Sequence, residues 1–304
     1  MRPIVVTGTS RSGKTLVRWL LSSHSRVTVS RRAELWPRFA GRFGDLSEPA
    51  NLERCLHAVL ERRQVAWLGP DRDRLRSEFR SGPPTYARLF GLIHEQAAER
   101  NGKGRWGDQS GRFESCVGAF LNAYPDATVV HLIRDPRDRY EALLSRHAAR
   151  PGDLGRTTAS WLRSVATAKH VGRAHPDSYV VVRFEDLVRD PEATARTLCA
   201  AIGEAYEPEM LRMDATRRFD ALRTGDDCPL RTEHVGRYRD FIDPHDVAFV
   251  QSVAGEQLTA LGYELDDVQM TAASRLRFAA SRPVNLACMG SSRFPRIPAG
   301  ARRP

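Results

Sequence analysis

Eight residues near the N-terminus have the spacing of a phosphate-binding loop. The segment from Gly8 to Thr15 reads G-T-S-R-S-G-K-T, which satisfies the pattern G-x-x-x-x-G-K-[ST]. Its glycines let the backbone turn so that successive N–H groups point at one anion, while Lys14 adds a charge and Thr15 a hydroxyl. The loop follows an apolar run, Ile4–Val6, and precedes a helix start, which favours anions. The sequence therefore predicts a site for a phosphorylated or sulfated nucleotide.

The elements that must position this loop alternate along the chain. Short runs rich in Val and Ile, apolar without alternation, predict strands that are buried on both faces of a parallel sheet. These strands are Ile4–Val6, Val27–Val29, Thr128–Ile133 and Tyr179–Phe184. Helical patterns fall at Lys14–His24, Leu52–Glu61, Tyr86–Glu99, Phe113–Ala123, Arg137–His147, Thr157–Val171, Pro191–Ile202 and from Pro244 to Leu261. The alternation predicts an α/β fold with a central parallel sheet flanked by helices.

The length and the less regular segments predict the domain organisation. The 304 residues suffice for one large domain, which we expect over residues 1–270, with a helical insertion at about 45–105. Within and beside that insertion, Gly41–Asn51 and Gly69–Pro84 are rich in Gly, Pro and charge and are predicted to be loops. From Thr271 onward the chain has seven arginines and no acidic residue, which predicts a partly disordered tail over 271–304.

The charge and composition narrow the class of partner. A net charge of +10 and a pI near 9.9 invite a nucleic-acid interpretation. However, 44 of the 47 basic residues are arginines spread over the whole length, and no zinc-finger, RNA-binding or leucine-zipper signature accompanies them. We therefore expect a small anionic ligand and no nucleic acid. No apolar run reaches the ~18 residues of a membrane span, no secretory signal is recognisable, and the five cysteines are scattered, which predicts a cytoplasmic protein with reduced thiols.

The strand Thr128–Ile133 bears on the choice between nucleotide chemistries. A kinase needs a carboxylate at the end of an apolar strand to hold Mg²⁺. Here the strand ends in Arg134, followed by Asp135. A cation at this point suits a second phosphate better than a metal, so no metal site is predicted. A small-molecule kinase that uses ATP and Mg²⁺ remains an alternative.

Five motifs, in this order, resemble those of the sulfotransferases that use 3′-phosphoadenosine 5′-phosphosulfate (PAPS), particularly bacterial and tyrosylprotein-type members. They are the loop Gly8–Leu16, similar to P-R-S-G-T-T-L; Trp106–Asp108; Val130–Asp138, similar to L-I-R-D-P-R-D; Val182–Leu187, similar to R-Y-E-D-L; and His234–Arg239, similar to the G-R-W segment. The resemblance covers about residues 1–265. It implies a phosphate-loop α/β fold, PAPS as sulfonyl donor, adenosine 3′,5′-bisphosphate (PAP) as product, and no metal.

The resemblance also implies a set of donor-binding residues. These are Ser10, Arg11, Ser12, Gly13, Lys14, Thr15, Arg134, Ser145, Arg183, Gly236 and Arg237. The loop residues match those that cradle the 5′-phosphosulfate, and Arg134 matches the arginine of the 3′-phosphate. Ser145 stands one helical turn beyond Ala142, where the family usually has a serine. Another interpretation of Arg134 is a surface ion pair with Asp138.

The catalytic roles follow from the chemistry of sulfonyl transfer. The transfer is an in-line displacement at sulfur, and cations and N–H groups can stabilise the leaving group without a metal. Arg11 matches the catalytic cation of the family, and Lys14 is a second candidate. The base is often a glutamate just after the second strand, which here is Glu34; its alternative role is a helix-start acid paired with Arg31 or Arg38. Asp108 is a second carboxylate candidate, although its neighbours predict a structural turn.

These features together predict a sulfotransferase that acts on a hydroxyl or amine. The acceptor is a small molecule, a carbohydrate or a peptide whose identity the motifs do not specify, and neither do they specify the oligomeric state. Ala142 and Gln109 depart from the family pattern. A noncatalytic nucleotide-binding module of the same fold therefore remains a further alternative. Trp36, Phe39 and Trp106 are candidates for an acceptor pocket or for the core.

Overall fold

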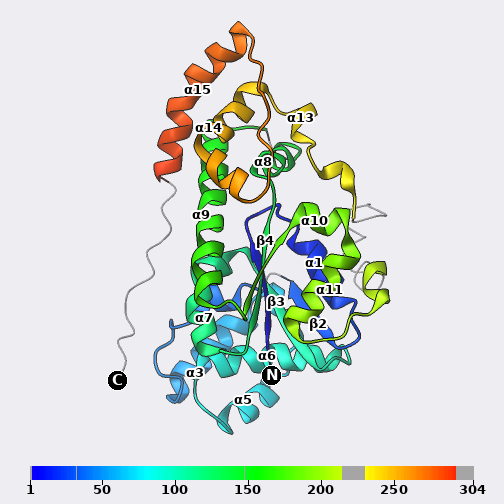
Figure 1. The fold of residues 1–304 in the computed structure, drawn as a ribbon. Helices are drawn as coiled ribbons and strands as arrows, with labels where there is room; N and C mark the ends of the chain where they lie inside the picture. Colours follow the sequence, from blue (N-terminus) through cyan, green and yellow to red (C-terminus); the bar gives the residue numbers. More distant parts are fainter. Residues whose placement is uncertain (1, 32, 147, 214–229, 292–304) are drawn as a thin grey trace. The chain divides into compact units, whose positions relative to one another are not determined.

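A computed structural model describes residues 2–31, 33–146, 148–213 and 230–291 (Figure 1). The chain divides into two compact units, which we describe separately. The sheet unit consists of Met1–Gly8, Gly13–Leu132 and His170–Arg231. The helical unit consists of Thr9–Ser12, Ile133–Lys169 and Thr232–Pro304. The single domain over residues 1–270 stays a prediction.

The sheet unit is built on five strands in the order β2-β3-β1-β4-β5. They are β1 (Ile4–Gly8), β2 (Val27–Arg31), β3 (Arg105–Gln109), β4 (Thr128–Ile133) and β5 (Tyr179–Arg183). The pairs β1–β3, β1–β4 and β2–β3 are parallel, with Ile4 opposite both Gly107 and Thr128. From β1 the chain continues to strands on one side and later to strands on the other, so the order reverses at β1. Ligands of open α/β sheets bind at the carboxyl end of such a switch point, where the phosphate loop Gly8–Thr15 begins.

Helices and short 3₁₀ segments surround the strands. Those of the sheet unit are α1 (Lys14–Ser22), α2 (Leu35–Phe39), α3 (Pro49–Leu60), α4 (Arg63–Ala66), α5 (Arg72–Arg80), α6 (Tyr86–Arg100), η1 (Gly111–Ser115), α7 (Val117–Ala123), α10 (Phe184–Arg189), α11 (Pro191–Ile202) and η2 (Pro208–Arg212). Those of the helical unit are α8 (Pro136–Leu144), η3 (Thr232–His234), α13 (Tyr238–Phe241), α14 (Pro244–Ala260) and α15 (Ala272–Ser291), and α9 (Asp153–Ala174) runs through both units. The segment from about 45 to 105 contains α3 to α6, and its being an insertion stays a prediction.

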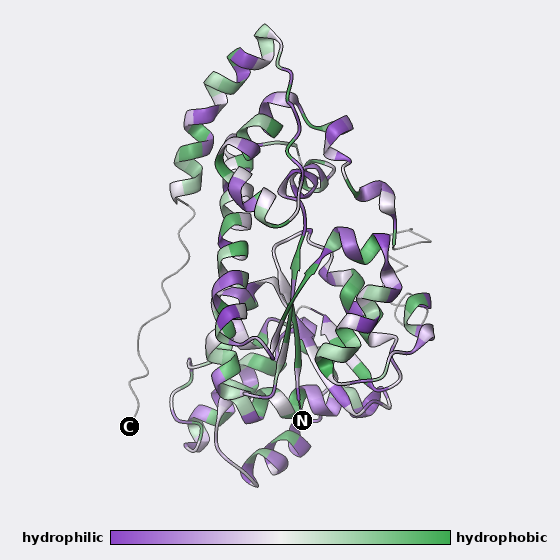
Figure 2. Cartoon of the chain, in the orientation of Figure 1, coloured by the Kyte–Doolittle hydropathy of each residue, from purple (hydrophilic) through white to green (hydrophobic). Residues whose placement is uncertain are grey.

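The core of the sheet unit lies where α1 and α11 cover the strands. Apolar side chains of α1, such as Val17 and Leu20, pack with Ile4 and Val6 of β1 and with Leu198 of α11. The strands β1, β3 and β4 are buried along their whole length, and β1 and β4 are largely green in the hydropathy colouring of Figure 2. The absence of polar alternation in β1 and β4 therefore has the cause expected from the sequence, because helices cover both faces.

The predicted α/β class with a central parallel sheet is confirmed, with local corrections. Trp106-Gly107-Asp108 is not a turn but the middle of strand β3, between β1 and β2. The segment 69–84 is not wholly a loop, because Asp71 caps the helix α5 by accepting hydrogen bonds from the N–H groups of Asp73 and Arg74. In the predicted tail, residues 272–291 form the helix α15, whereas 292–304 lie outside the described residues.

Candidate functional site

In the sheet unit, the second half of the phosphate loop has a backbone that only glycine adopts easily. Gly8 has φ 136° and Gly13 has φ 95°. The ammonium of Lys14 donates a 2.8 Å hydrogen bond to the carbonyl of Gly8 and is thereby held across the loop. Helix α1 starts at Lys14 without a side-chain cap, and a helix start of this kind favours an anion. Lys14 is also 7% exposed, so its charge acts close to the loop backbone.

Gly13 is further constrained by Phe184, which follows Arg183 at the end of β5. A Cβ atom placed on Gly13 would lie 2.6 Å from Cδ2 of Phe184, well inside van der Waals contact. The phenyl ring thus closes one side of the loop and brings the R-F-E-D segment next to it. Arg183 itself is 23% exposed and lies 4.0 Å from the carboxylates of Glu185 and Asp186.

We expect Gly13→Ala to destabilise the protein by about 1–3 kcal/mol, because alanine is strained at this φ and meets Phe184. Urea unfolding measures the free energy of unfolding. Gly118→Ala is the matched control, since Gly118 lies exposed in helix α7 with nothing within 4 Å of its added Cβ. Equal unfolding free energies for Gly13→Ala and the wild type would contradict the packing described here.

In the helical unit, Arg134 joins the first half of the loop to the segment around Gly236. Its guanidinium donates to the carbonyl of Arg11 at 3.3 Å and to that of His234 at 2.7 Å. With 7% exposure, Arg134 is not the surface residue that a simple ion pair with Asp138 would require. Arg11 has φ 66°, a left-handed backbone that is rare outside glycine and is often retained at functional sites.

Asp138 and Arg139 hold this arrangement together, although neither is among the predicted donor-binding residues. The carboxylate of Asp138 accepts hydrogen bonds from the N–H groups of Gly236 at 2.8 Å and Tyr238 at 3.0 Å. Burial raises the pKa of Asp138, while those two N–H groups lower it. Arg139 donates from Nε to the carbonyl of Ser10 at 2.9 Å. Both residues belong to the D-P-R-D-R run that starts at Asp135. Their place in this run is the sequence signal by which they could have been predicted.

Two other predicted donor-binding residues have partners within the helical unit. Arg237 donates from Nε to Glu141 at 3.0 Å, and its guanidinium lies 4.4 Å from the ring centroid of Phe241. Ser145 caps the end of α8, and its hydroxyl donates to the carbonyl of Ala142 at 3.2 Å. The helical unit therefore connects residues 10 and 11, Arg134, Arg139 and the 234–238 segment by direct contacts. The role of Ser145 stays a prediction.

In the sheet unit, Glu34 lies just after β2 on a left-handed backbone with φ 51° and ψ 28°. Its carboxylate lies 3.8 Å from Arg38 and 3.7 Å from Arg112, and the side chain is 27% exposed. The pair with Arg38 was foreseen as an alternative role. The pair with Arg112 was not, because Arg112 is 78 residues away in the sequence. A partly exposed carboxylate on a strained backbone is compatible with the predicted base.

Asp108, which the structure places on β3 rather than in a turn, is fully buried beside this region. The hydroxyl of Ser30 donates to its Oδ1 at 3.0 Å. Burial raises the pKa of Asp108 to about 7, and the negative charge of Glu34 contributes to the increase, while hydrogen bonds from Ser30 and from backbone N–H groups oppose it. Asp108 therefore gains a proton more readily than an ordinary aspartate.

This pKa predicts a pH-dependent stability. Between about pH 4 and 7 the folded state binds more protons at Asp108 than the unfolded state does, so the contribution of this group to stability falls as the pH rises through that window. At about 1.4 kcal/mol for each pKa unit, the loss is up to about 4 kcal/mol. We expect Asp108→Asn to flatten the pH dependence of the unfolding free energy, measured in urea at pH 5 and pH 8. The exposed Asp126→Asn should keep the slope of the wild type, and the same slope in Asp108→Asn would contradict the assignment.

The aromatic candidates are mainly part of the core. Trp36 packs edge-on against Phe120 with ring centroids 5.1 Å apart, and Trp106 packs against Phe90 at 5.5 Å. Gly107 allows β3 to approach β1, since a Cβ there would lie 2.7 Å from the carbonyl oxygen of Ile4. Gln109, which departs from the family pattern, is buried at the end of β3.

Comparison with known proteins agrees with the motifs. The model of the sulfotransferase family matches residues 3–208, about two thirds of the chain. Among solved structures, the sulfotransferase domain from the Synechococcus PCC 7002 olefin synthase is similar with a TM-score of 0.58 and 20% identity, over 87% of this chain and 95% of that one. The sulfotransferase domain from the curacin biosynthetic pathway gives a TM-score of 0.55 and 17% identity, over 87% and 98%. No curated protein matches the chain. The likeness of the structures concerns the fold, and the match to the family model shows that the chain belongs to the sulfotransferase family.

Proposed function

We propose that this protein transfers a sulfonyl group from PAPS to a hydroxyl or amine of an acceptor. The observation that carries the proposal is the position of Arg134. This buried guanidinium follows directly after strand β4 and contacts the backbone of both the loop residue Arg11 and His234. A guanidinium binds phosphate oxygens with two parallel hydrogen bonds, so this position suits the 3′-phosphate that distinguishes PAPS from ATP.

The kinase alternative loses support at Asp135. This carboxylate caps helix α8 by accepting from the N–H of Arg137 at 2.8 Å, and it accepts again from the guanidinium of Arg137 at 2.7 Å. Both carboxylate oxygens therefore have partners within the helical unit. The carboxylate that follows β4 therefore caps a helix and pairs with Arg137, which is a structural role and not that of a magnesium ligand. Within the described residues, no group of three or more His, Cys, Asp or Glu side chains forms a candidate metal site.

The loop residues fit a phosphate-bearing donor. Gly13 leaves a space next to Phe184 that a Cβ would fill, and the positive φ angles at Gly8, Arg11 and Gly13 turn the loop backbone. In this assignment, Ser10–Thr15 bind the 5′-phosphosulfate, while Arg134, Gly236 and Arg237 bind the 3′-phosphate, with Arg183 and Ser145 as further donor contacts. PAPS supplies the sulfonyl group when it is bound.

The chemistry then divides among three side chains. Glu34 accepts the proton of the acceptor hydroxyl or amine on its carboxylate. Arg11 and Lys14 stabilise the negative charge that develops at the donor phosphate, which requires fixed cations rather than a metal. The acceptor, whether a small molecule, a carbohydrate or a peptide, and a cytoplasmic location stay predictions. No helix in the described part of the chain is long and apolar enough to cross a membrane.

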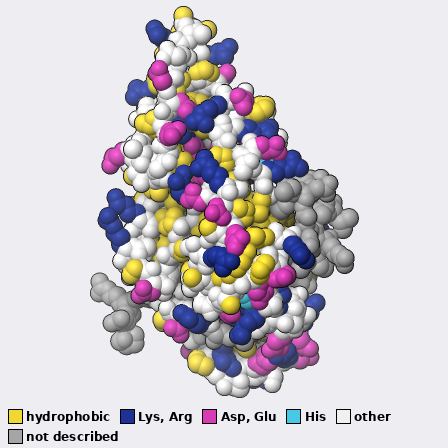
Figure 3. All heavy atoms as spheres, turned by 45° about the vertical axis from the view of Figure 1, so that its right-hand side comes forward, with side chains coloured by type: hydrophobic (Ala, Val, Ile, Leu, Met, Phe, Trp, Pro, Cys, Tyr) yellow, Lys and Arg dark blue, Asp and Glu magenta, His cyan; other side chains and the backbone are white. Residues whose placement is uncertain are grey.

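On the face shown in Figure 3, arginine and lysine side chains alternate with acidic ones instead of forming one continuous basic surface. Nucleic-acid binding by phosphate neutralisation depends on a basic patch or stripe. Despite the net charge of +10, this face therefore has no basic patch of the kind that binds nucleic acid. This supports a small anionic ligand as the partner.

Calorimetric titration of the magnesium-free protein with PAP, ADP and ATP tests the donor class. We expect PAP to bind most tightly and Arg134→Ala to weaken it by about 10- to 100-fold, the effect of losing a charged hydrogen-bonded pair. Arg134→Lys keeps the positive charge but not the two parallel N–H donors of the guanidinium, so its affinity for PAP should lie between those of the wild type and Arg134→Ala. Arg146→Ala, an exposed position just beyond α8, is the matched control. Binding of ATP alone, and only with Mg²⁺, would replace the proposal with a kinase.

A further inference from the structure

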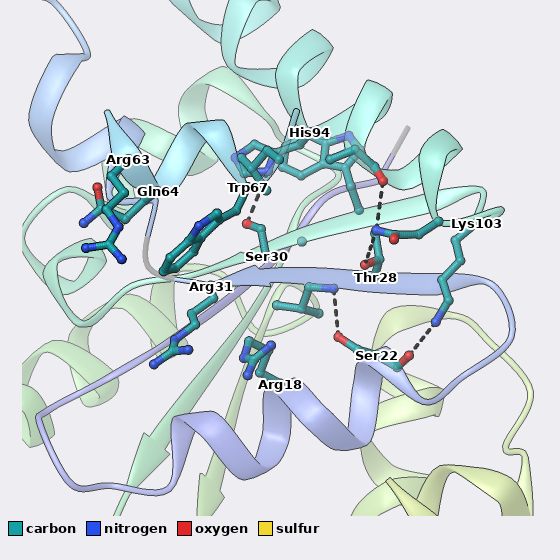
Figure 4. Close-up of a pocket in the computed structure, with 16 residues that line it drawn as sticks. Arg18, Ser22, Thr28, Ser30, Arg31, Arg63, Gln64, Trp67, His94 and Lys103 are labelled. Atoms are coloured by element: carbon teal, nitrogen blue, oxygen red, sulfur yellow. Dashed lines mark hydrogen bonds between the residues drawn. The ribbon is translucent and has the colours of Figure 1, made fainter. Parts of the chain in front are cut away.

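A pocket of about 900 Å³ lies in the sheet unit along the outer edge of β2 (Figure 4). Its walls come from β2 and β3, from α1, α4 and α6, and from the segments that follow α4 and α6. In Figure 4, Arg18 and Ser22 of α1 lie on one side of the strand, and His94 lies on the other. Because β2 is at the edge of the sheet, with β3 as its one neighbour in the strand order, the pocket follows an edge that no strand of the described residues covers.

The charge of this pocket has one sign. Four basic residues line it, namely Arg18, Arg31, Arg63 and Lys103, and none of the described lining residues is acidic. The ammonium of Lys103 is occupied by backbone carbonyls, including those of His24 and Val27 at 2.9 Å. Beside it, Arg18, Arg31 and Arg63 bring three guanidinium groups to the lining of the pocket. Arginines inside a concave pocket favour a carboxylate, sulfonate or phosphate group.

The rest of the lining is apolar and flat. Trp67 is 54% exposed, an unusual exposure for the largest side chain, and the guanidinium of Arg63 lies 5.7 Å from its ring. Leu68 and Val29 continue this surface, and the stacked rings of His94 and Trp106, 4.9 Å apart, form a further wall. An exposed indole at the rim of a pocket of this size provides a platform for an aromatic ring.

His94 adds a polar group whose hydrogen bonding is incomplete. When Asp108 is ionised, the hydroxyl of Ser30 donates to it, and the 3.3 Å contact of that hydroxyl with Nδ1 of His94 then places the ring proton on Nδ1. Burial lowers the pKa of His94 to about 3, so the ring is neutral near pH 7. Its Nε2 is then an acceptor, and among the described residues this buried atom has no hydrogen-bond partner. A hydroxyl or N–H group of a ligand would supply the hydrogen bond that Nε2 lacks.

We propose that the pocket beside β2 binds an aromatic acid that also carries a hydrogen-bond donor. The acid group binds the guanidinium groups of Arg18 and Arg31, and the ring packs on Trp67. A donor on the ring pairs with Nε2 of His94. This site is distinct from the donor-binding residues, none of which lines the pocket, and it does not depend on the proposed sulfonyl transfer.

Fluorescence and calorimetric titration with 6-hydroxy-2-naphthoate test this proposal. We expect saturable binding that is at least about tenfold tighter than that of the neutral 6-hydroxy-2-naphthamide. Arg31→Gln should remove this preference for the acid, and Trp67→Ala should weaken both probes, whereas Trp67→Phe keeps a ring and should retain most of the affinity. Arg54 is an exposed arginine on α3 outside the pocket, so Arg54→Gln should change the affinity of neither probe.

The same titration in the presence of saturating PAP separates this pocket from the donor site. Unchanged naphthoate affinity supports two sites. Displacement of the naphthoate by PAP would overturn the proposal, and so would equal affinity for acid and amide, an unaffected Arg31→Gln variant, or no binding up to about 10 mM. The melting temperature of each variant checks that a loss of binding does not come from unfolding.

Discussion

Replacing Glu34 by glutamine is expected to lower kcat by about 10²- to 10⁴-fold, the usual contribution of a positioned general base. Glutamine has nearly the same shape and can keep the left-handed backbone of this position as well as glutamate does. What it loses is the negative charge of the carboxylate, because the neutral amide is too weak a base to take the proton of the acceptor. The assay is the release of PAP from PAPS, with water and with a panel of phenols, alcohols and amines as acceptors.

Two controls separate a loss of chemistry from a loss of structure. Glu34→Gln should bind PAP with an affinity within about twofold of the wild type, because PAP has no acceptor proton to remove. Glu61→Gln, at an exposed position after α3, should leave kcat unchanged. If Glu34→Gln retains kcat within a few fold, the base is another group, and the buried Asp108 becomes the next candidate because its pKa of about 7 is close to the working pH.

Arg11 is the position with the second large expected effect. Removing a cation that acts mainly on the developing charge should cost about 10²–10³ in kcat. The variant of choice is Arg11→Asn, because Arg11 has φ 66° and asparagine tolerates this region far better than alanine does. Its backbone carbonyl can then continue to accept from Arg134, so the loop contact is preserved.

The comparison of kcat with PAP affinity decides the role of Arg11. A catalytic cation predicts a large fall in kcat with a small change in the affinity for PAP, which lacks the sulfonyl group. Arg11→Lys should recover part of the rate because it restores the charge. A fall in PAP affinity as large as the fall in kcat would instead assign Arg11 to ground-state binding of the donor.

Much of the fold was predictable because its signals are local. The strands β1 and β4 are mostly apolar, and helix α11 begins at Asp190-Pro191 and ends before Gly203, as cap residues in the sequence require. The phosphate loop was likewise readable from eight consecutive residues, since the turn, the charge and the helix start are all encoded there. Local motifs of this kind need no knowledge of their neighbours.

Strand β3 was not predictable in the same way. Its sequence, Arg105-Trp-Gly-Asp-Gln109, has charged residues at its first and fourth positions and a glycine at its centre. This composition predicts a turn rather than a strand. The segment becomes a strand because β1 and β2 flank it on both sides, and Gly107 permits that approach to Ile4. A central strand is stabilised by partners that lie far away in the sequence, so its own composition carries little of the signal.

The sequence by itself determined the phosphate loop, the α/β class and the order of the motifs, because each depends on neighbouring residues and their spacing. The tertiary structure alone decided which distant groups meet. It placed Arg112 beside Glu34 and Asp138 under the N–H groups of Gly236 and Tyr238. It also buried Asp108 beside Ser30 and opened the pocket along β2. Contacts, burial and the resulting pKa values arise from long-range packing, which no local pattern in the chain specifies.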